Sequence, residues 1–209
     1  MERLQSIAEK LQKGDANGIR EEVQLALQEG IAPRQILEGA LLEAMSEIGA
    51  KFKANEIFVP EVLIAARAMN AAMEVLKPKL VETGVEPVGR VIIGTVKGDL
   101  HDIGKNLVKM MLEGAGFEVK DLGIDVAPAQ FVDAVKEYKP QFVGMSALLT
   151  TTMSEMRSVV EAIESEGLRD QVTIMVGGAP VTDKFAADIG ADFYSKDAAE
   201  AASMARDRI

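Results

Sequence analysis

Val96-Lys97-Gly98-Asp99-Leu100-His101-Asp102-Ile103-Gly104-Lys105-Asn106 contains the only histidine of the 209-residue chain, two residues after an aspartate and three before a glycine. A β-branched run, Val91-Ile92-Ile93, precedes this stretch and predicts a buried parallel strand, and apolar residues recur at helical spacing after it. We therefore expect His101 on a strand-to-helix loop. Open α/β sheets bind their ligands at such loops, beyond the carboxyl ends of the strands.

An imidazole at this position can bind a transition metal, provided that the ring is neutral. A carboxylate that accepts the second ring N–H fixes the tautomer and makes the coordinating nitrogen more basic. Asp99 suits this role because it lies two residues back on an extended segment, whereas Asp102 is adjacent and less well placed. Gly104 has no side chain, which leaves room for a bulky ligand beside the backbone. For the motif alone, a solvent-exposed histidine in a polar loop is the competing interpretation.

The composition excludes several classes of site. The chain has 33 acidic and 23 basic residues and no basic cluster with interleaved aromatics, which argues against nucleic-acid binding. It has no cysteine, which excludes a disulfide framework and a thiolate metal site, and a single histidine excludes a multi-histidine site. The first residues lack an apolar signal core and no run approaches membrane-spanning length, so we expect a cytoplasmic protein without a membrane partner.

Helical periodicity extends through residues 1–83 and predicts four amphipathic helices. The first apolar stripe stops at Gly14 and the second at Gly30, and Pro33 and Pro60 suit the first turns of the third and fourth helices. We expect a break at residues 49–59. Four such helices with short joints predict a helical bundle, whose plainest role is packing or dimerisation.

The segment from Pro78 to Gly89 has the composition of a linker, and we expect a helical domain at 1–83, a linker at 84–89 and a second domain at 90–209. Strand-like and helix-like segments alternate five times in the second domain. This alternation predicts an α/β fold of the flavodoxin or Rossmann type, with a five-stranded parallel sheet covered on both faces. The expected strands are Arg90–Thr95, Glu118–Leu122, Phe142–Ser146, Thr173–Val176 and Asp192–Tyr194, and the expected helices are Gly104–Gly114, Pro128–Tyr138, Met153–Ser165, Thr182–Ile189 and Asp197–Arg206.

Two later motifs extend the histidine motif into a family pattern. After the D-x-H-x-x-G of residues 99–104 come Ser146-Ala147-Leu148 and Gly177-Gly178, each at the end of an expected strand. This series resembles the cobalamin-binding signature of methionine synthase and of the small corrinoid proteins of methyl-transfer systems, over nearly the whole chain. The resemblance implies cobalamin bound base-off/His-on, with His101 as the lower axial ligand of cobalt.

The resemblance implies further contacts with the cofactor. Ser146 would contact the displaced nucleotide tail, and the glycine pair would let its heterocycle lie against the backbone. Thr152 stands where methionine synthase has a serine that extends the histidine–aspartate pair into a triad, and Phe52 and Val59 would cover the upper face of the ring. The cofactor-binding residues that we expect are Asp99, His101, Asp102, Ile103, Gly104, Ser146, Leu148, Thr150, Thr152, Gly177, Gly178, Phe52 and Val59.

A chain with these two domains has no barrel to bind a methyl donor or acceptor. The resemblance therefore implies a methyl carrier and not a complete enzyme. Its cobalamin would accept a methyl group from a substrate-specific methyltransferase and pass it to a second methyltransferase with a folate or thiol acceptor, and a reductive activase would be a further partner. The methyl donor, the acceptor, the corrinoid form and the oligomeric state cannot be read from the sequence.

Two other functions use the same motif. The cobalamin-binding subunit of an adenosylcobalamin mutase is one, but a helical cap argues against it because radical formation needs the upper face open to a barrel. A cobalamin-dependent sensor is the other, but such sensors usually add a DNA-binding helix-turn-helix, and the acidic N-terminal half offers no basic recognition helix. Without any cofactor, a plain two-domain scaffold would remain.

Overall fold

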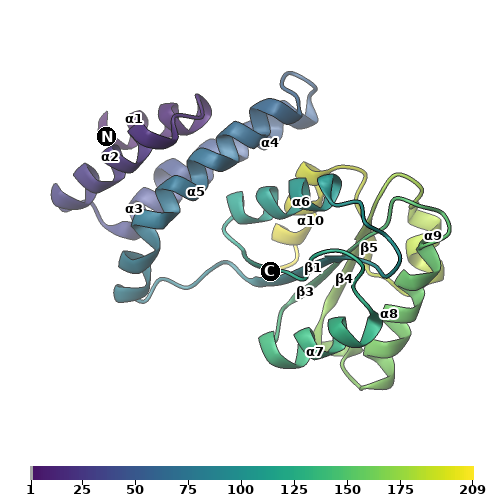
Figure 1. The fold of residues 1–209 in the computed structure, drawn as a ribbon. Helices are drawn as coiled ribbons and strands as arrows, with labels where there is room; N and C mark the ends of the chain where they lie inside the picture. The colour runs from purple at the N-terminus through teal and green to yellow at the C-terminus, as the bar shows by residue number, and fades with distance from the viewer. Residues whose placement is uncertain (1) are drawn as a thin grey trace. The chain divides into compact units, whose positions relative to one another are not determined.

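The structure is a computed structural model that describes residues 2–209. Its contacts divide the chain into two compact units, one that runs to Pro87 and includes residues 114–116, and one that comprises Val88–Glu113 and Phe117–Ile209. The first is helical and the second is an α/β unit (Figure 1). None of the helices within residues 2–209 is long and apolar enough to span a membrane.

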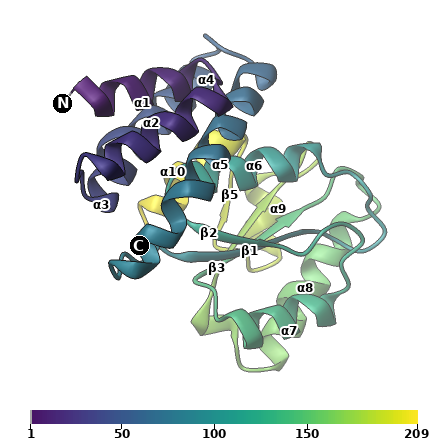
Figure 2. The same cartoon turned by 60° about the vertical axis from the view of Figure 1, so that its left-hand side comes forward.

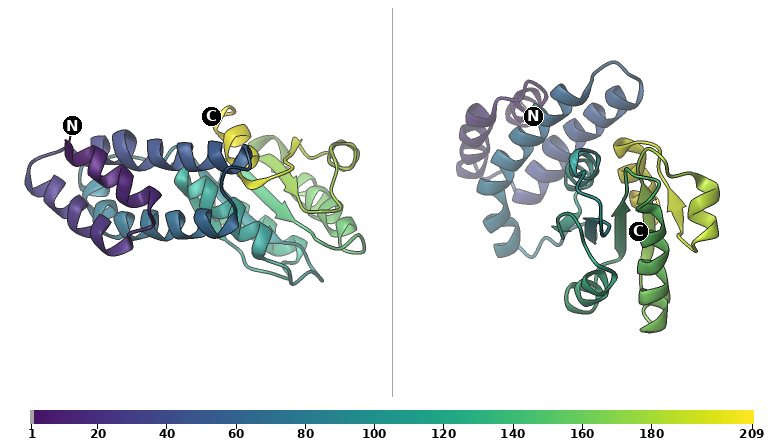
Figure 3. Two further views of the ribbon diagram at one scale, coloured as in Figure 1. Left: turned by 90° about the horizontal axis from the view of Figure 1, so that it is seen from above. Right: turned by 45° about the vertical axis from the view of Figure 1, so that its right-hand side comes forward.

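The first unit consists of four helical rods that lie side by side (Figure 3). The third rod is composite, because a π-helical segment joins two α-helices within it. Alanines and branched side chains recur at helical spacing on the inward face of each rod and make the core of this unit. The elements are α1 (Glu2–Gln12), α2 (Ala16–Gln28), the composite rod of α3 (Pro33–Ile36), η1 (Leu37–Leu42) and α4 (Glu43–Lys53), and α5 (Val59–Glu82). The predicted N-terminal helical region is confirmed.

The joint between the third and fourth rods is shorter than predicted. We expected a break from Gly49, but α4 continues to Lys53, so that only residues 54–58 lack helical structure. Gly49 is buried in the helix, where the loss of helix propensity is offset by packing. In α5, Leu63 is 41% exposed, whereas Val62 beside it is fully buried.

Helix α5 passes through Pro78, so the prediction of a linker beginning at this proline was wrong for residues 78–82. A proline inside a helix removes one hydrogen bond and crowds the preceding turn. Leu76 and Leu80 on either side are both buried, and this packing holds the last turns of the helix in place. The predicted boundary of the helical domain at residue 83 follows directly after Glu82, the last residue of α5.

The second unit has a five-stranded parallel sheet in the order β2-β1-β3-β4-β5. This is the flavodoxin-like arrangement, and the predicted fold class is confirmed. The strands are β1 (Arg90–Thr95), β2 (Glu118–Asp121), β3 (Phe142–Ser146), β4 (Thr173–Gly177) and β5 (Phe193–Tyr194). The helices are α6 (Ile103–Gly114), α7 (Pro128–Tyr138), α8 (Met153–Ser165), the short 3-10 helix η2 (Arg169–Gln171), α9 (Asp183–Asp188) and α10 (Ala198–Arg206).

Helices cover both faces of the sheet (Figures 1 and 2). α7, α8 and α9 share a core with β1, β3 and β4, centred on Phe131, Met156 and Ile174, and α6 and α10 cover the other face. β1 lies between β2 and β3, so the chain first adds β2 on one side of β1 and then adds β3, β4 and β5 on the other side. The loops after β1 and β3 therefore diverge at the carboxyl edge, which is where such sheets form a ligand crevice.

Candidate functional site

The loop after β1 carries Asp99 and His101 and is closed by a tight turn. The Asp99 N–H donates to the Val96 carbonyl at 3.1 Å. Gly98, at the third position of this turn, has a φ of 79°, a left-handed conformation that favours glycine. The hydroxyl of Thr95, the last residue of β1, donates to the His101 carbonyl at 2.9 Å. These bonds tie the main chain of His101 to the end of the strand.

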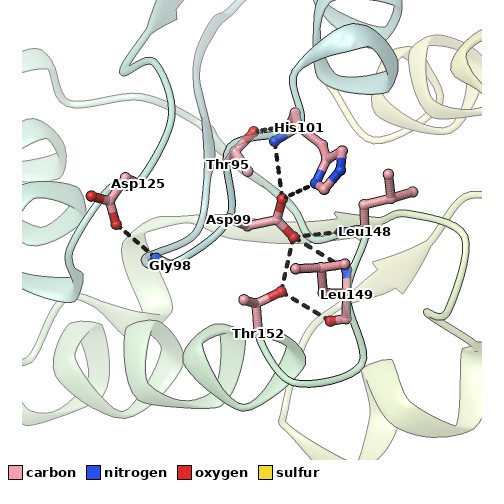
Figure 4. Close-up of polar contacts among 8 residues, drawn as sticks. All are labelled: Thr95, Gly98, Asp99, His101, Asp125, Leu148, Leu149 and Thr152. Atoms are coloured by element: carbon pink, nitrogen blue, oxygen red, sulfur yellow. Dashed lines mark hydrogen bonds and ion pairs between the residues drawn. The ribbon is translucent and has the colours of Figure 1, made fainter.

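Asp99 fixes the orientation and the tautomer of the histidine ring (Figure 4). His101 Nδ1 lies 2.7 Å from Asp99 Oδ1, and the His101 backbone N–H donates to the same oxygen at 3.0 Å. An ionised carboxylate only accepts, so Nδ1 carries a proton, and the tautomer of the neutral ring that fits this contact has its lone pair on Nε2. The His101 side chain is 51% exposed, while that of Asp99 is fully buried. The ring is therefore held with Nδ1 against Asp99, and Nε2 is the ring nitrogen that is left to contact a ligand.

The second oxygen of Asp99 binds the loop after β3. Oδ2 accepts from the backbone N–H groups of Leu148 and Leu149, at 2.8 and 3.2 Å. The hydroxyl of Thr152 lies 2.9 Å from Oδ2 and 2.9 Å from the Leu149 carbonyl, and its one proton serves either acceptor. Asp99 thus joins the loops after β1 and β3, and the expected chain from His101 through Asp99 to Thr152 exists as a set of hydrogen bonds.

Two opposing effects set the protonation of Asp99. Burial by itself raises the pKa of this carboxyl, because a buried charge loses its hydration. The backbone N–H groups of His101 and Leu148, the histidine ring and the Thr152 hydroxyl outweigh it and hold the pKa of Asp99 well below its usual range. The carboxylate is therefore ionised, as the assignment of the ring proton to Nδ1 requires.

The surface beside His101 is open and apolar, which fits a large ligand. Ile103 is 75% exposed, and Leu148 and Thr150 are exposed on the loop after β3. A Cβ added to Gly104 would have no atom within 4 Å, so the space in front of this glycine is free. Asp102 takes no part in the contacts of the ring. It accepts a hydrogen bond from Asn106 at 3.0 Å and supports the first turn of α6.

The remaining predicted residues of this unit stand on neighbouring strands. Ser146 and Gly177 face each other in the register of β3 and β4, next to the site, and Ser146 is half-buried. Gly178 has a φ of 133°, and a Cβ there would lie 1.9 Å from the Ala147 carbonyl oxygen. The fold itself therefore requires glycine at 178. A Cβ at Gly177 would make only ordinary contact, 3.6 Å from the nearest atom, the Ser195 carbonyl oxygen.

Phe52 and Val59 belong to the helical unit. Phe52 lies in the last turn of α4 and Val59 opens α5, so the two flank the joint at residues 54–58, and each is half-buried. Phe58, which we did not predict as a site residue, is the larger exposed apolar group at this joint, at 62%. The expected role of Phe52 and Val59 as a cover for the ring stays a prediction.

The sequence reasoning missed four residues that hold the site together. Thr95 and Leu149 contact the loop and Asp99 as described above. Asp125, after β2, accepts from the Gly98 N–H at 2.7 Å, and buried Lys105 binds both oxygens of Asp121 at 2.6 and 2.7 Å. A position just beyond a strand end was the only available signal for Asp125. Backbone donors such as the N–H of Leu149 have no residue-type signature at all.

Within residues 2–209, no group of three or more histidine, aspartate or glutamate side chains is arranged to hold a metal ion. His101 with its buried carboxylate is the metal-ligand arrangement that the sequence predicted, and it stands at the switch point of the sheet. The half-exposed imidazole of His101 and the free space at Gly104 fit a flat, metal-containing ring that brings its own equatorial ligands.

Comparison with known proteins gives the family of the chain. Two family models, each described as a B12 binding domain, match residues 89–205 and 3–77. Trimethylamine corrinoid protein 1 of Methanosarcina acetivorans is 46% identical over 87% of this chain and 85% of its own length. Dimethylamine corrinoid protein 1 of the same organism is 44% identical over 85% and 84%. The methanol:cobalamin methyltransferase complex MtaBC from Methanosarcina barkeri contains a chain with a TM-score of 0.90 at 30% identity, covering 99% of this chain and 79% of that one. The chain therefore belongs to the family of B12-binding corrinoid proteins.

Proposed function

We propose that this chain is a methyl carrier that holds cobalamin in the base-off/His-on state, with Nε2 of His101 as the lower ligand of cobalt. The observation that carries the proposal is the pairing of an exposed imidazole with a buried, ionised Asp99, which leaves Nε2 as the free nitrogen. When bound, cobalamin supplies a metal centre that accepts and donates a methyl group, and the protein supplies position and electrostatics.

We assign a role to each predicted residue. Asp99 holds the ring proton on Nδ1, and Thr152 supports the carboxylate from behind. Ser146, Leu148, Thr150, Gly177 and Gly178 would receive the nucleotide tail of the cofactor along the loops after β3 and β4. Asp102, Ile103 and Gly104 would border the lower face of the ring. In this proposal, residues 1–83 form the cap in which Phe52 and Val59 cover the upper face, 84–89 the linker and 90–209 the cofactor-binding domain.

The names of the relatives suggest the partners. Relatives named for trimethylamine and dimethylamine are almost equally similar, and a structural match comes from a complex that is named a methanol:cobalamin methyltransferase. We propose a substrate-specific methyltransferase as methyl donor, a second methyltransferase to a folate or thiol, a reductive activase, and a cytoplasmic location. These relatives favour a methyl carrier over a mutase subunit or a sensor.

The first test is reconstitution with hydroxocobalamin. After gel filtration the wild-type protein should retain the colour and show the absorption of imidazole-ligated cobalamin. His101→Ala should lose this absorption, and free imidazole should restore it. A colourless wild-type protein, or a variant whose spectrum equals that of the wild type, would contradict the ligand assignment.

A second test addresses methyl transfer. The loaded, reduced protein should take up a labelled methyl group from a methylamine or methanol methyltransferase. A mutase subunit would take up none. A sensor would instead retard a DNA fragment in a gel-shift assay, which we do not expect of a chain with 33 acidic and 23 basic residues.

A further inference from the structure

Asp125, in the loop between β2 and α7, makes two hydrogen bonds to the turn that carries Asp99. Its Oδ1 accepts from the Gly98 N–H at 2.7 Å, and its own N–H donates to the Asp99 carbonyl at 3.1 Å. In Figure 4 the side chain of Asp125 approaches Gly98 from the side opposite to His101. The two hydrogen bonds are made to the peptide groups on either side of the one that links Gly98 to Asp99, and they restrain that peptide from both ends.

The local backbone shows why an aspartate is suited to this position. In a turn closed by the bond from Asp99 N–H to Val96, the Gly98 N–H has no acceptor within the turn and needs one from outside. Asp125 supplies a charged acceptor, which makes a stronger hydrogen bond than a neutral one. Asp125 has a φ of 54°, a left-handed conformation that aspartate and asparagine tolerate better than most residues.

The segment around Asp125 is itself fixed to the end of β1. The Thr95 N–H donates to the Gly123 carbonyl, and the Val126 N–H donates to the Thr95 carbonyl, each at 3.0 Å. The isolated parallel bridge between Val96 and Val126 continues this pairing. Asp125 therefore stands on a segment that is held independently of the histidine turn, and it can restrain that turn.

An ion pair between buried Lys105 and the more exposed Asp121 holds the start of the same loop. Lys105, in the first turn of α6, is 3% exposed and binds both carboxylate oxygens of Asp121. Burial raises the pKa of Asp121, but the Lys105 ammonium and the Gly123 N–H outweigh it and leave that pKa below its ordinary value. The segment between β2 and α7 is therefore bonded to α6 through Asp121 and to the turn of Asp99 through Asp125.

The restraint on Asp99 passes to the metal-binding nitrogen. Asp99 Oδ1 receives both the backbone N–H and the ring Nδ1 of His101, so a rotation of the Asp99 main chain would turn the imidazole with it. We propose that Asp125 is a positioning residue: through the Gly98–Asp99 peptide it keeps the lone pair of His101 Nε2 in the orientation that binds the cobalt of cobalamin. This inference rests on the proposed function.

Three variants separate this role from simple loop stability. Asp125→Gly removes the acceptor without opposing the positive φ, and Asp125→Asn keeps a side-chain oxygen and tolerates the same φ. Asp133→Ala, an exposed aspartate on α7, is the control for lost charge. Each protein is loaded with hydroxocobalamin, and absorption gives the ratio of histidine-bound to unligated cofactor. Thermal unfolding of the unloaded proteins is measured alongside.

Asp133→Ala should load like the wild type, Asp125→Asn should fall between the wild type and Asp125→Gly because its acceptor is neutral, and free imidazole should restore the ligated spectrum of Asp125→Gly. In Asp125→Gly the ratio should fall about tenfold or more, as expected for loss of a hydrogen bond to a charged group. A wild-type ratio in Asp125→Gly would overturn the proposal, even if that variant unfolds at a lower temperature. If Asp125→Gly does not fold, Asp125→Ser is measured in its place. Its ratio of histidine-bound to unligated cofactor should lie below that of the wild type, and a wild-type ratio in Asp125→Ser would also overturn the proposal. Failure of the proposed function would be distinguishable, because the wild type itself would then lack the histidine-bound spectrum.

Discussion

Replacing Asp99 by asparagine should abolish histidine ligation while leaving the protein folded. The carboxylate accepts two hydrogen bonds at Oδ1, both from His101, and as many as three at Oδ2, from Leu148, Leu149 and Thr152. Asparagine has one acceptor oxygen and one NH₂ donor, so one of these sets must face the amide nitrogen.

The structure decides which orientation costs less. With the NH₂ at the Oδ2 position, the backbone N–H groups of both Leu148 and Leu149 lose their acceptor. With the NH₂ at the Oδ1 position, only the backbone N–H of His101 loses its acceptor. The ring keeps a hydrogen bond, because it can change to its other tautomer, in which Nδ1 accepts from the NH₂. At about 1–3 kcal/mol for each stranded donor, the second arrangement is favoured. The proton then moves to Nε2, which can no longer bind a metal.

We therefore expect Asp99→Asn to lower the free energy of unfolding by about 1–3 kcal/mol and to lose the spectrum of imidazole-ligated cobalamin. Differential scanning calorimetry of the unloaded protein gives the first quantity, as a fall of roughly 2–12 °C in Tm, and absorption after loading gives the second. Asp102→Asn is the matched control, because Asp102 contacts Asn106 and not the ring. An Asp99→Asn protein with both wild-type Tm and wild-type spectrum would refute the reasoning.

Substitutions at three further positions test separate parts of the site. Gly178→Ala should destabilise the unloaded protein by at least about 2 kcal/mol, since its Cβ would clash with the Ala147 carbonyl at a φ of 133°; an unchanged Tm would contradict this. Gly104→Ala should leave the unloaded protein as stable as the wild type or about 0.5–1 kcal/mol more stable, because the space at this residue is free and alanine favours helix. The same substitution should weaken the retention of cobalamin on gel filtration. Undiminished retention would show that the ring does not approach this backbone. Thr152→Val should cost about 1–2 kcal/mol, measured by calorimetry, and Thr152→Ser much less, because only the serine keeps a hydroxyl for Asp99; equal losses would assign the effect to packing.

The sequence predicts the sheet well because its strands are short apolar runs separated by helical periods. Phe142–Ser146 is one of these strands, and its predicted bounds are those of β3. Helix ends are less predictable, because packing overrides local signals. The residue types of Gly49 and Pro78 predict breaks, yet each lies within a helix whose neighbouring side chains are buried.

The site was predictable where residue type determines the chemistry. A histidine two residues after an aspartate can be recognised in the sequence, and Nδ1 of His101 does contact Asp99. The supports could not be found in this way. Asp125 reaches Gly98 across 27 residues, and Leu149 contributes only a backbone N–H, so both depend on the order of the strands and not on a local motif.

The central claim is that Nε2 of His101 binds cobalt, and one measurement tests it most directly. Because the chain has a single histidine, nitrogen-15-labelled histidine marks this side chain alone. The labelled protein is loaded with cob(II)alamin and its electron paramagnetic resonance spectrum is recorded against an unlabelled sample. We predict that labelling changes each superhyperfine triplet of the axial nitrogen to a doublet. Triplets that persist in the labelled protein would show that the axial nitrogen comes from the cofactor's own base and would contradict the account.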